Sequence, residues 1–137
     1  MLRIREKDIP AGGGALTRLE QFSQTSPLVI NDNYVMCLHE SRSGQMWFGL
    51  WDGGLALFDP GKNDLQHFQR AGDISLTAYP NVAFAEKHEA GQLKLYVGTR
   101  GNGLLKCTLD ATGQKLAIER HFHFEAGQKD CLSNDKI

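Results

Sequence analysis

Four residues in the sequence have side chains that would suit the binding of a saccharide. Trp51 offers a flat aromatic face on which a sugar ring can stack, and Arg100 can hold a carboxylate or sulfate group through paired hydrogen bonds. Asn33 and Tyr79 carry groups that can pair with sugar hydroxyls. Trp51 and Arg100 are 49 residues apart, which is close to the period of an internal repeat.

A structural role is also open for each of these residues. Trp51 would fit in the packing between two sheets, because tryptophan is readily buried. Arg100 would be satisfied in solvent or in a salt bridge between sheets. Polar residues of connecting segments would serve equally well to cap turns through hydrogen bonds to the backbone. The connecting-segment residues open to either role are Asn31, Asp32, Asn33, Tyr79 and Asn81.

No arrangement of residues points to catalysis or to a metal site. His121 and His123 are two residues apart and face the same side of a strand, but two histidines without a third ligand do not make a metal centre. We find no Ser/His/Asp or Cys/His constellation, and the carboxylates are too scattered to name a glycosidase-type pair. We therefore expect a chain that is not an enzyme, with no catalytic residue, no metal and no cofactor.

Composition narrows the class of protein. The chain has 137 residues, of which 41% are hydrophobic and 23% charged, as in an ordinary globular domain. A formal net charge of -1 gives no basic field for nucleic acid, and no apolar stretch is long enough to cross a membrane. Residues 1–8 lack the apolar core of a secretory signal. The widely spaced Cys37, Cys107 and Cys131 fit small buried hydrophobes better than a disulfide framework.

An internal repeat dominates the sequence. Residues 35–55 and 82–104 share an apolar strand, a Gly-Gln turn, a second apolar strand ending in glycine, and a further glycine five positions on. Phe22, Phe68 and Phe122 recur at spacings of 46 and 54 residues. A period near 50 residues indicates one small structural unit per repeat.

Each repeat predicts four short strands joined by turn residues. In the first unit they cover residues 35–40, 46–50, 55–59 and 65–70. In the second unit the last two strands cover residues 104–109 and 116–124. Four antiparallel strands in a unit of this length describe a β-propeller blade, so the fold class is all-β with four-stranded antiparallel blades.

The repeat also predicts how the chain is divided. Residues 1–28 would hold the third and fourth strands of a preceding blade, residues 29–75 and 76–130 one blade each, and residues 131–137 the start of a following blade. The sequence thus reads as a partial propeller of about two and a half blades. We expect the remaining blades to come from a parent chain or from a homo-oligomer.

These motifs resemble the two-component regulator propeller repeat. The resemblance rests on residues 47–55 (WFGLWDGGL) with Phe58-Asp59-Pro60, on residues 91–104, and on residues 132–135 (LSND), which are similar to the inter-blade signature of that family. Leu50 stands where the family usually has threonine, and Tyr96 where it has tryptophan.

The resemblance implies the ligand-sensing, extracytoplasmic propeller of a hybrid two-component sensor histidine kinase. Such a segment would be periplasmic, would bind an oligosaccharide or a similar small ligand, and would signal to a kinase outside these residues. It would contact neither nucleic acid nor the membrane. The alternative is a propeller that serves as a protein-interaction or dimerisation scaffold and has no small-molecule ligand.

Overall fold

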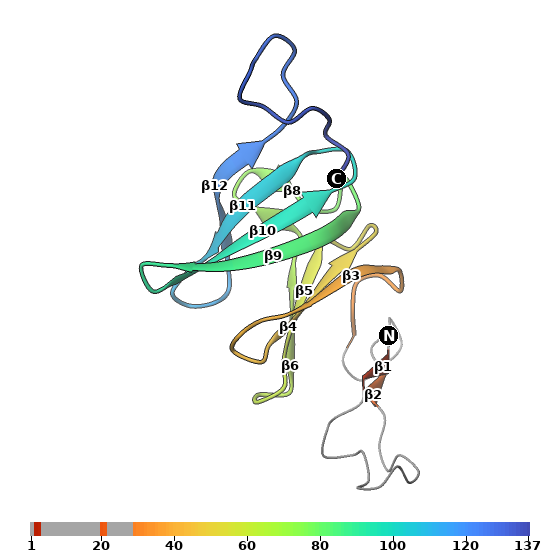
Figure 1. Cartoon of the computed structure of the whole chain (residues 1–137). Coiled ribbons are helices and arrows are strands. Elements are labelled where there is room, and N and C mark those ends of the chain that lie inside the picture. Colours follow the sequence, from red (N-terminus) through yellow and green to blue (C-terminus); the bar gives the residue numbers. More distant parts are fainter. Residues whose placement is uncertain (1, 4–19, 22–28) are drawn as a thin grey trace, which may run out of the picture.

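The computed structural model describes residues 2–3, 20–21 and 29–137, and every regular element in these residues is a β-strand (Figure 1). At the N-terminal end β1 (Leu2–Arg3) pairs antiparallel with β2 (Glu20–Gln21). The sequence predicts two strands of a preceding blade here, over residues 2–4 and 16–22. Most of that predicted unit lies outside the described residues.

The first sheet contains four antiparallel strands in chain order. They are β3 (Val35–Glu40), β4 (Met46–Leu50), β5 (Leu55–Asp59) and β6 (Asp64–Phe68). The short apolar runs and the intervening turn residues give the bounds of the first three strands correctly. The fourth strand ends two residues earlier than predicted, because the chain leaves this sheet after Phe68.

The second sheet repeats the same four-strand meander and adds two short strands. Its main strands are β9 (Asn81–Glu89), β10 (Gln92–Thr99), β11 (Leu104–Leu109) and β12 (Leu116–Phe122), and the added pair is β7 (Arg70–Ala71) and β8 (Ile74–Ser75). The order across the sheet is β8-β7-β12-β11-β10-β9.

The β7–β8 hairpin is a feature that the repeat does not predict. Residues 70–75 belong to the predicted first blade, yet β7 runs parallel to β12, with Ala71 beside Leu116. The backbone N–H of Gly72 donates to the carbonyl of Leu116 at 2.9 Å, and the Ala71 side chain is buried. The connection between the two meanders therefore extends the outer edge of the second sheet.

The first strand of each meander has an irregularity at the same place. Cys37 faces Gly49 and Ala83 faces Gly98, and in both ladders the register shifts immediately before these pairs along the first strand. When the two ladders are aligned at Gly49 and Gly98, Asn81 occupies the position of Val35, whereas the sequence repeat aligns Val35 with Val82. This shift of one residue puts an amide where the first unit has an aliphatic side chain.

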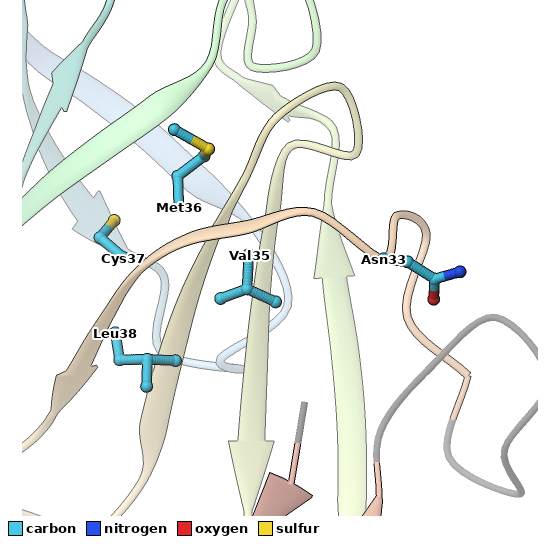
Figure 2. A pocket seen from close by; sticks show the side chains of 5 residues that line it. All are labelled: Asn33, Val35, Met36, Cys37 and Leu38. Carbon is cyan, nitrogen blue, oxygen red and sulfur yellow. The ribbon is translucent and has the colours of Figure 1, made fainter.

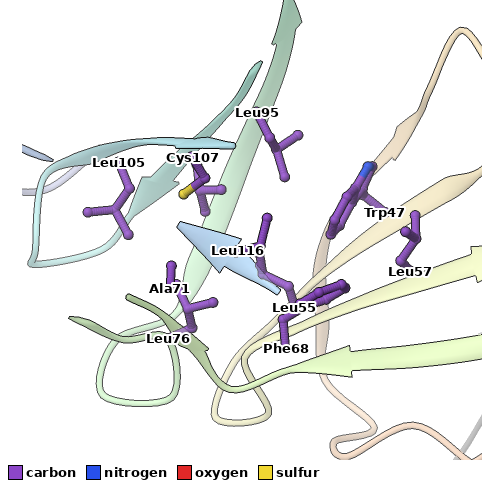
Figure 3. Packing of buried hydrophobic residues seen from close by; sticks show 11 residues of the cluster. Trp47, Leu55, Leu57, Phe68, Ala71, Leu76, Leu95, Leu105, Cys107 and Leu116 are labelled. Carbon is purple, nitrogen blue, oxygen red and sulfur yellow. The ribbon is translucent and has the colours of Figure 1, made fainter. Parts of the chain in front are cut away.

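The two sheets pack together through a shared apolar core (Figure 3). Trp47 of the first sheet points towards Leu95 of the second, as predicted for an inter-sheet core residue, and Leu55 and Phe68 lie beside Leu116. The Trp47 ring is fully buried, with ring centroids 5.4 Å from Phe68 and 6.4 Å from Phe84. This core fixes how the two meanders sit against each other.

The opposite face of the first sheet is also apolar and buried. Phe48 and Phe58 have no exposed surface, and Ile30, Leu50 and Ala56 complete their cluster. A sheet that is buried on both faces is expected between two neighbouring layers.

The opposite face of the second sheet carries an ion-pair network instead. The Lys106 ammonium lies 2.9 Å from Glu119 and 3.2 Å from Glu89, and Lys94 lies 2.6 Å from Glu119. Hydrogen bonds from Lys94 and Lys106 lower the pKa of the Glu119 carboxyl to about 2, and the pKa of Lys106 is raised. The two faces of this sheet therefore differ in chemistry.

A buried carboxylate links the first strands of the two sheets. Burial disfavours ionisation of Glu86, but hydrogen bonds from Ser41, from the Arg42 backbone and from His88 and His39 outweigh it and lower its pKa to about 2. The imidazole Nε2 atoms of His39 and His88 lie 3.3 and 3.2 Å from its two oxygens. The Glu86 carboxylate of β9 therefore stays ionised at neutral pH, and its contact with His39 of β3 holds the two strands side by side.

Candidate functional site

Two hairpin turns, residues 50–54 between β4 and β5 and residues 99–103 between β10 and β11, have the same construction. Each is closed by a backbone hydrogen bond from its first residue to its last, of 3.1 Å in the first turn and 3.0 Å in the second. Gly54 and Gly103 have φ values of 79° and 70°, and a Cβ there would lie 2.3 and 2.1 Å from a backbone oxygen. Only glycine fits these closing positions.

Each turn lies against the linker that precedes its sheet. In the first unit the N–H of Trp51 donates to the carbonyl of Tyr34 at 3.0 Å, and in the second the N–H of Arg100 donates to Pro80 at 2.9 Å. The Asp32 carboxylate also accepts the N–H of Asp52 at 2.8 Å. The backbone around Trp51 and Arg100 is therefore held in the same way in both units.

Each turn also lies against the linker that follows its sheet. The Asn81 side-chain amide donates to the carbonyls of Leu50 and Gly54 at 3.4 and 3.2 Å. In the second unit the carbonyl of Asp135 accepts from the N–H groups of Gly101 and Gly103 at 3.1 and 2.9 Å. The two turns and the linkers of residues 31–34, 76–80 and 134–137 form one surface, which we call the turn-and-linker end.

The predicted site residues all reach the surface at the turn-and-linker end. Trp51 is 39% and Tyr79 41% exposed, and Arg100 and Asn33 are also exposed. The Tyr79 ring packs on Gly101, where a Cβ would come within 2.8 Å of it. The backbone contacts thus place Asn33 near Trp51 and Tyr79 near Arg100.

Two of the polar linker residues are structural. Asn81 has no exposed surface and Asp32 is only 9% exposed, so neither side chain is presented to a ligand at the surface. The Asp32 carboxylate accepts from the N–H of Tyr34 and of Asp52. Asn81 binds three carbonyls, including that of Leu76 at 2.8 Å. Turn capping, the other role open to them, describes both.

Sequence reasoning missed two exposed residues at this end. Tyr34 is the most exposed large hydrophobic side chain among the described residues, at 73%. Lys136 forms an isolated antiparallel bridge with Arg100 and is exposed as well. Tyr34 follows Asn33 directly, so the repeat predicts its position in the linker. The proximity of Lys136 to Arg100 could be seen only in the folded structure.

A pocket of about 420 Å³ lies beside β3 and is continuous with the linker at Asn33 (Figure 2). Its other lining residues are Val35, Met36, Cys37 and Leu38. Leu38 is 53% exposed, so the wall is open and largely apolar. Burial raises the pKa of the Cys37 thiol to about 11, which leaves it protonated and unreactive at neutral pH.

The histidine and cysteine side chains form no metal site among the described residues. The rings of His121 and His123 lie on the same side of the chain, with centroids 4.9 Å apart, and His121 Nε2 contacts the carbonyl of Asn102 at 2.7 Å. Cys107 is buried, which raises its pKa to about 12, and Cys131 sits in the loop of residues 125–131, where its sulfur bonds to the backbone of Glu125.

Comparisons with known proteins place the chain in no family. No protein-family model matches it, and a search of curated proteins gives no significant match. No helix in the described part of the chain is long and apolar enough to cross a membrane.

Proposed function

We propose that the chain is a segment of a ligand-sensing β-propeller and that it binds an oligosaccharide at its turn-and-linker end. Each four-stranded meander would be one blade. The bound state would be transmitted to a histidine kinase of a two-component system outside these residues, with the propeller in the periplasm. The resemblance of residues 47–55 and 91–104 to the two-component regulator propeller repeat supports this signalling role.

The packing of the two meanders supports the blade assignment. They have the same strand order, pack face to face, and hold their first strands β3 and β9 next to each other. In a propeller the first strands of neighbouring blades line the central axis. Residues 135–137 contact the second turn and Asn81 contacts the first, so each turn meets the segment that follows its meander, which is the relation expected of successive blades.

The exposed aromatic side chains carry the proposal of saccharide binding. Tyr34, Trp51 and Tyr79 are 73%, 39% and 41% exposed, and all belong to the turn or linkers of one end. Aromatic side chains bind ligands well where one side of the ring is packed against protein and the other faces solvent. Their faces stack on the apolar side of a sugar ring. Asn33 and Arg100 beside them supply polar groups for hydroxyls or anionic substituents.

Fluorescence of Trp51 provides the test. The chain has two tryptophans, so the Trp47→Phe variant reports on Trp51 alone. Titration with cellotetraose, an oligogalacturonate tetrasaccharide and a chondroitin sulfate tetrasaccharide should give a saturable change in emission with at least one sugar. In the otherwise native chain, Trp51→Ala should weaken that binding, measured by calorimetry, by about tenfold.

The matched control is Arg42→Ala, which removes an exposed side chain from the β3–β4 turn at the opposite end. It should leave the affinity unchanged. Failure of every sugar to bind, or equal affinity with and without the Trp51 ring, would contradict saccharide binding at this end. A defined oligomer seen by light scattering in that case would favour the interaction scaffold.

A further inference from the structure

Two cationic side chains lie side by side at the turn-and-linker end. Arg100 and Lys136 are partners in an isolated antiparallel bridge, and both are exposed. Side chains of directly opposed residues point to the same face and start about 5 Å apart. The neighbouring Ile137 points the other way along this segment, against Gly98. The guanidinium and the ammonium therefore emerge on the same side.

This pairing lacks an acidic partner among the described residues. No ion pair joins either side chain to a carboxylate in the described part of the chain. The nearest carboxylate in sequence, that of Asp135, accepts the backbone N–H of Phe124. Directly opposed like charges destabilise a sheet. A bound anion would remove that penalty.

The contrast with the other lysines of the second sheet is informative. Lys94 and Lys106 each lie within 3.2 Å of a glutamate, so their charges are compensated within the sheet. Arg100 and Lys136 are left open to solvent instead. Beside them the Tyr79 ring, packed on Gly101 and 41% exposed, offers a stacking face.

We infer that Arg100 and Lys136 bind the carboxylate or sulfate groups of an anionic oligosaccharide, with Tyr79 stacking on the adjacent ring. This inference rests on the proposed function and specifies its ligand class. A guanidinium holds a planar anion through two hydrogen bonds, and the ammonium adds a second charge that needs no fixed direction. A neutral sugar would leave both cations unpaired.

Calorimetry with the full chain tests the inference. The probes are the oligogalacturonate tetrasaccharide, the chondroitin sulfate tetrasaccharide, neutral cellotetraose and inorganic sulfate. Arg100→Ala/Lys136→Ala should weaken binding of the best anionic sugar by about 30-fold or more. The control Arg42→Ala/Lys62→Ala removes the same charge from turns at the opposite end and should change the affinity by less than twofold, on the order of a rim-charge effect.

The outcomes separate this inference from the proposed function. The anionic ligand is overturned if cellotetraose binds more strongly than either anionic sugar, and if Trp51→Ala weakens this binding while Arg100→Ala/Lys136→Ala does not. Saccharide binding would then remain in place. Inorganic sulfate that binds as tightly as the sulfated sugar overturns the saccharide as the ligand. Binding by none of the probes overturns both proposals.

Discussion

Trp47→Ala should lower the free energy of unfolding by about 3–5 kcal/mol, the largest effect expected of a single side-chain truncation in this chain. The indole is fully buried between the two sheets and touches Phe68 from the first and Phe84 from the second. Its removal leaves a cavity that two rigid sheets cannot close. Chemical denaturation followed by circular dichroism measures the loss.

Two matched variants make this prediction specific. Trp47→Phe should cost less than about 2 kcal/mol, because the indole N–H has no hydrogen-bond partner among the described residues and its removal leaves no orphaned group. Trp51→Ala makes the same truncation at a 39% exposed position and should cost about 1 kcal/mol. Equal losses for Trp47→Ala and Trp51→Ala would mean that the two sheets do not share this core.

Asn81→Asp, an almost isosteric change, should destabilise the chain by about 4 kcal/mol at pH 7. The Asn81 amide nitrogen donates to the carbonyls of Leu50, Gly54 and Leu76, and the side chain has no exposed surface. A carboxylate in its place would face three carbonyl oxygens with no proton to offer. The measurement is again the free energy of unfolding by denaturant.

The pH dependence of this loss follows from the same contacts. Burial among acceptors raises the pKa of the introduced carboxyl in the folded state above its unfolded value. The loss is therefore full above the raised pKa and shrinks as the pH falls through it, since the protonated acid can donate again. Asn134→Asp is the control, because its oxygen accepts from Lys136 N–H and keeps that role. Equal losses at both sites would contradict a stabilising role for the hydrogen bonds from Asn81 to the three carbonyls.

Much of the strand pattern was predictable from local chemistry. Short apolar runs bounded by turn residues mark β3, β4 and β5, and the glycine pairs mark the turns that follow β4 and β10. These signals are local, so a single sequence carries them. The buried position of Trp47 agrees with its place in such an apolar run.

Contacts between distant segments were not predictable in the same way. The parallel pairing of β7 with β12 joins Ala71 to Leu116, and no local pattern marks a crossing of this kind. The strand pairing aligns Asn81, and not Val82, with Val35, so the sequence repeat is off by one residue in this strand and an amide lies in the core. Identical residue types in the linkers therefore have opposite roles, with Asn33 exposed and Asn81 buried.

The candidate site shows the same division. Trp51, Tyr79, Arg100 and Asn33 follow from residue type and repeat position, and all lie at the surface of one end. Lys136 becomes a neighbour of Arg100 only because the chain returns past the second turn. The proximity of these two cationic residues depends on that return of the chain, so the sequence alone does not predict it.

Mapping of ligand contacts by nuclear magnetic resonance tests the central claim most directly. When the best-binding oligosaccharide is added to the ¹⁵N-labelled chain, the amide signals of residues 33–34, 51–53, 79, 100–103 and 135–137 should shift together. These residues form the turn-and-linker end. Shifts confined to residues 42–44, 61–63, 90–91 and 111–114, at the opposite end of the sheets, would contradict the account.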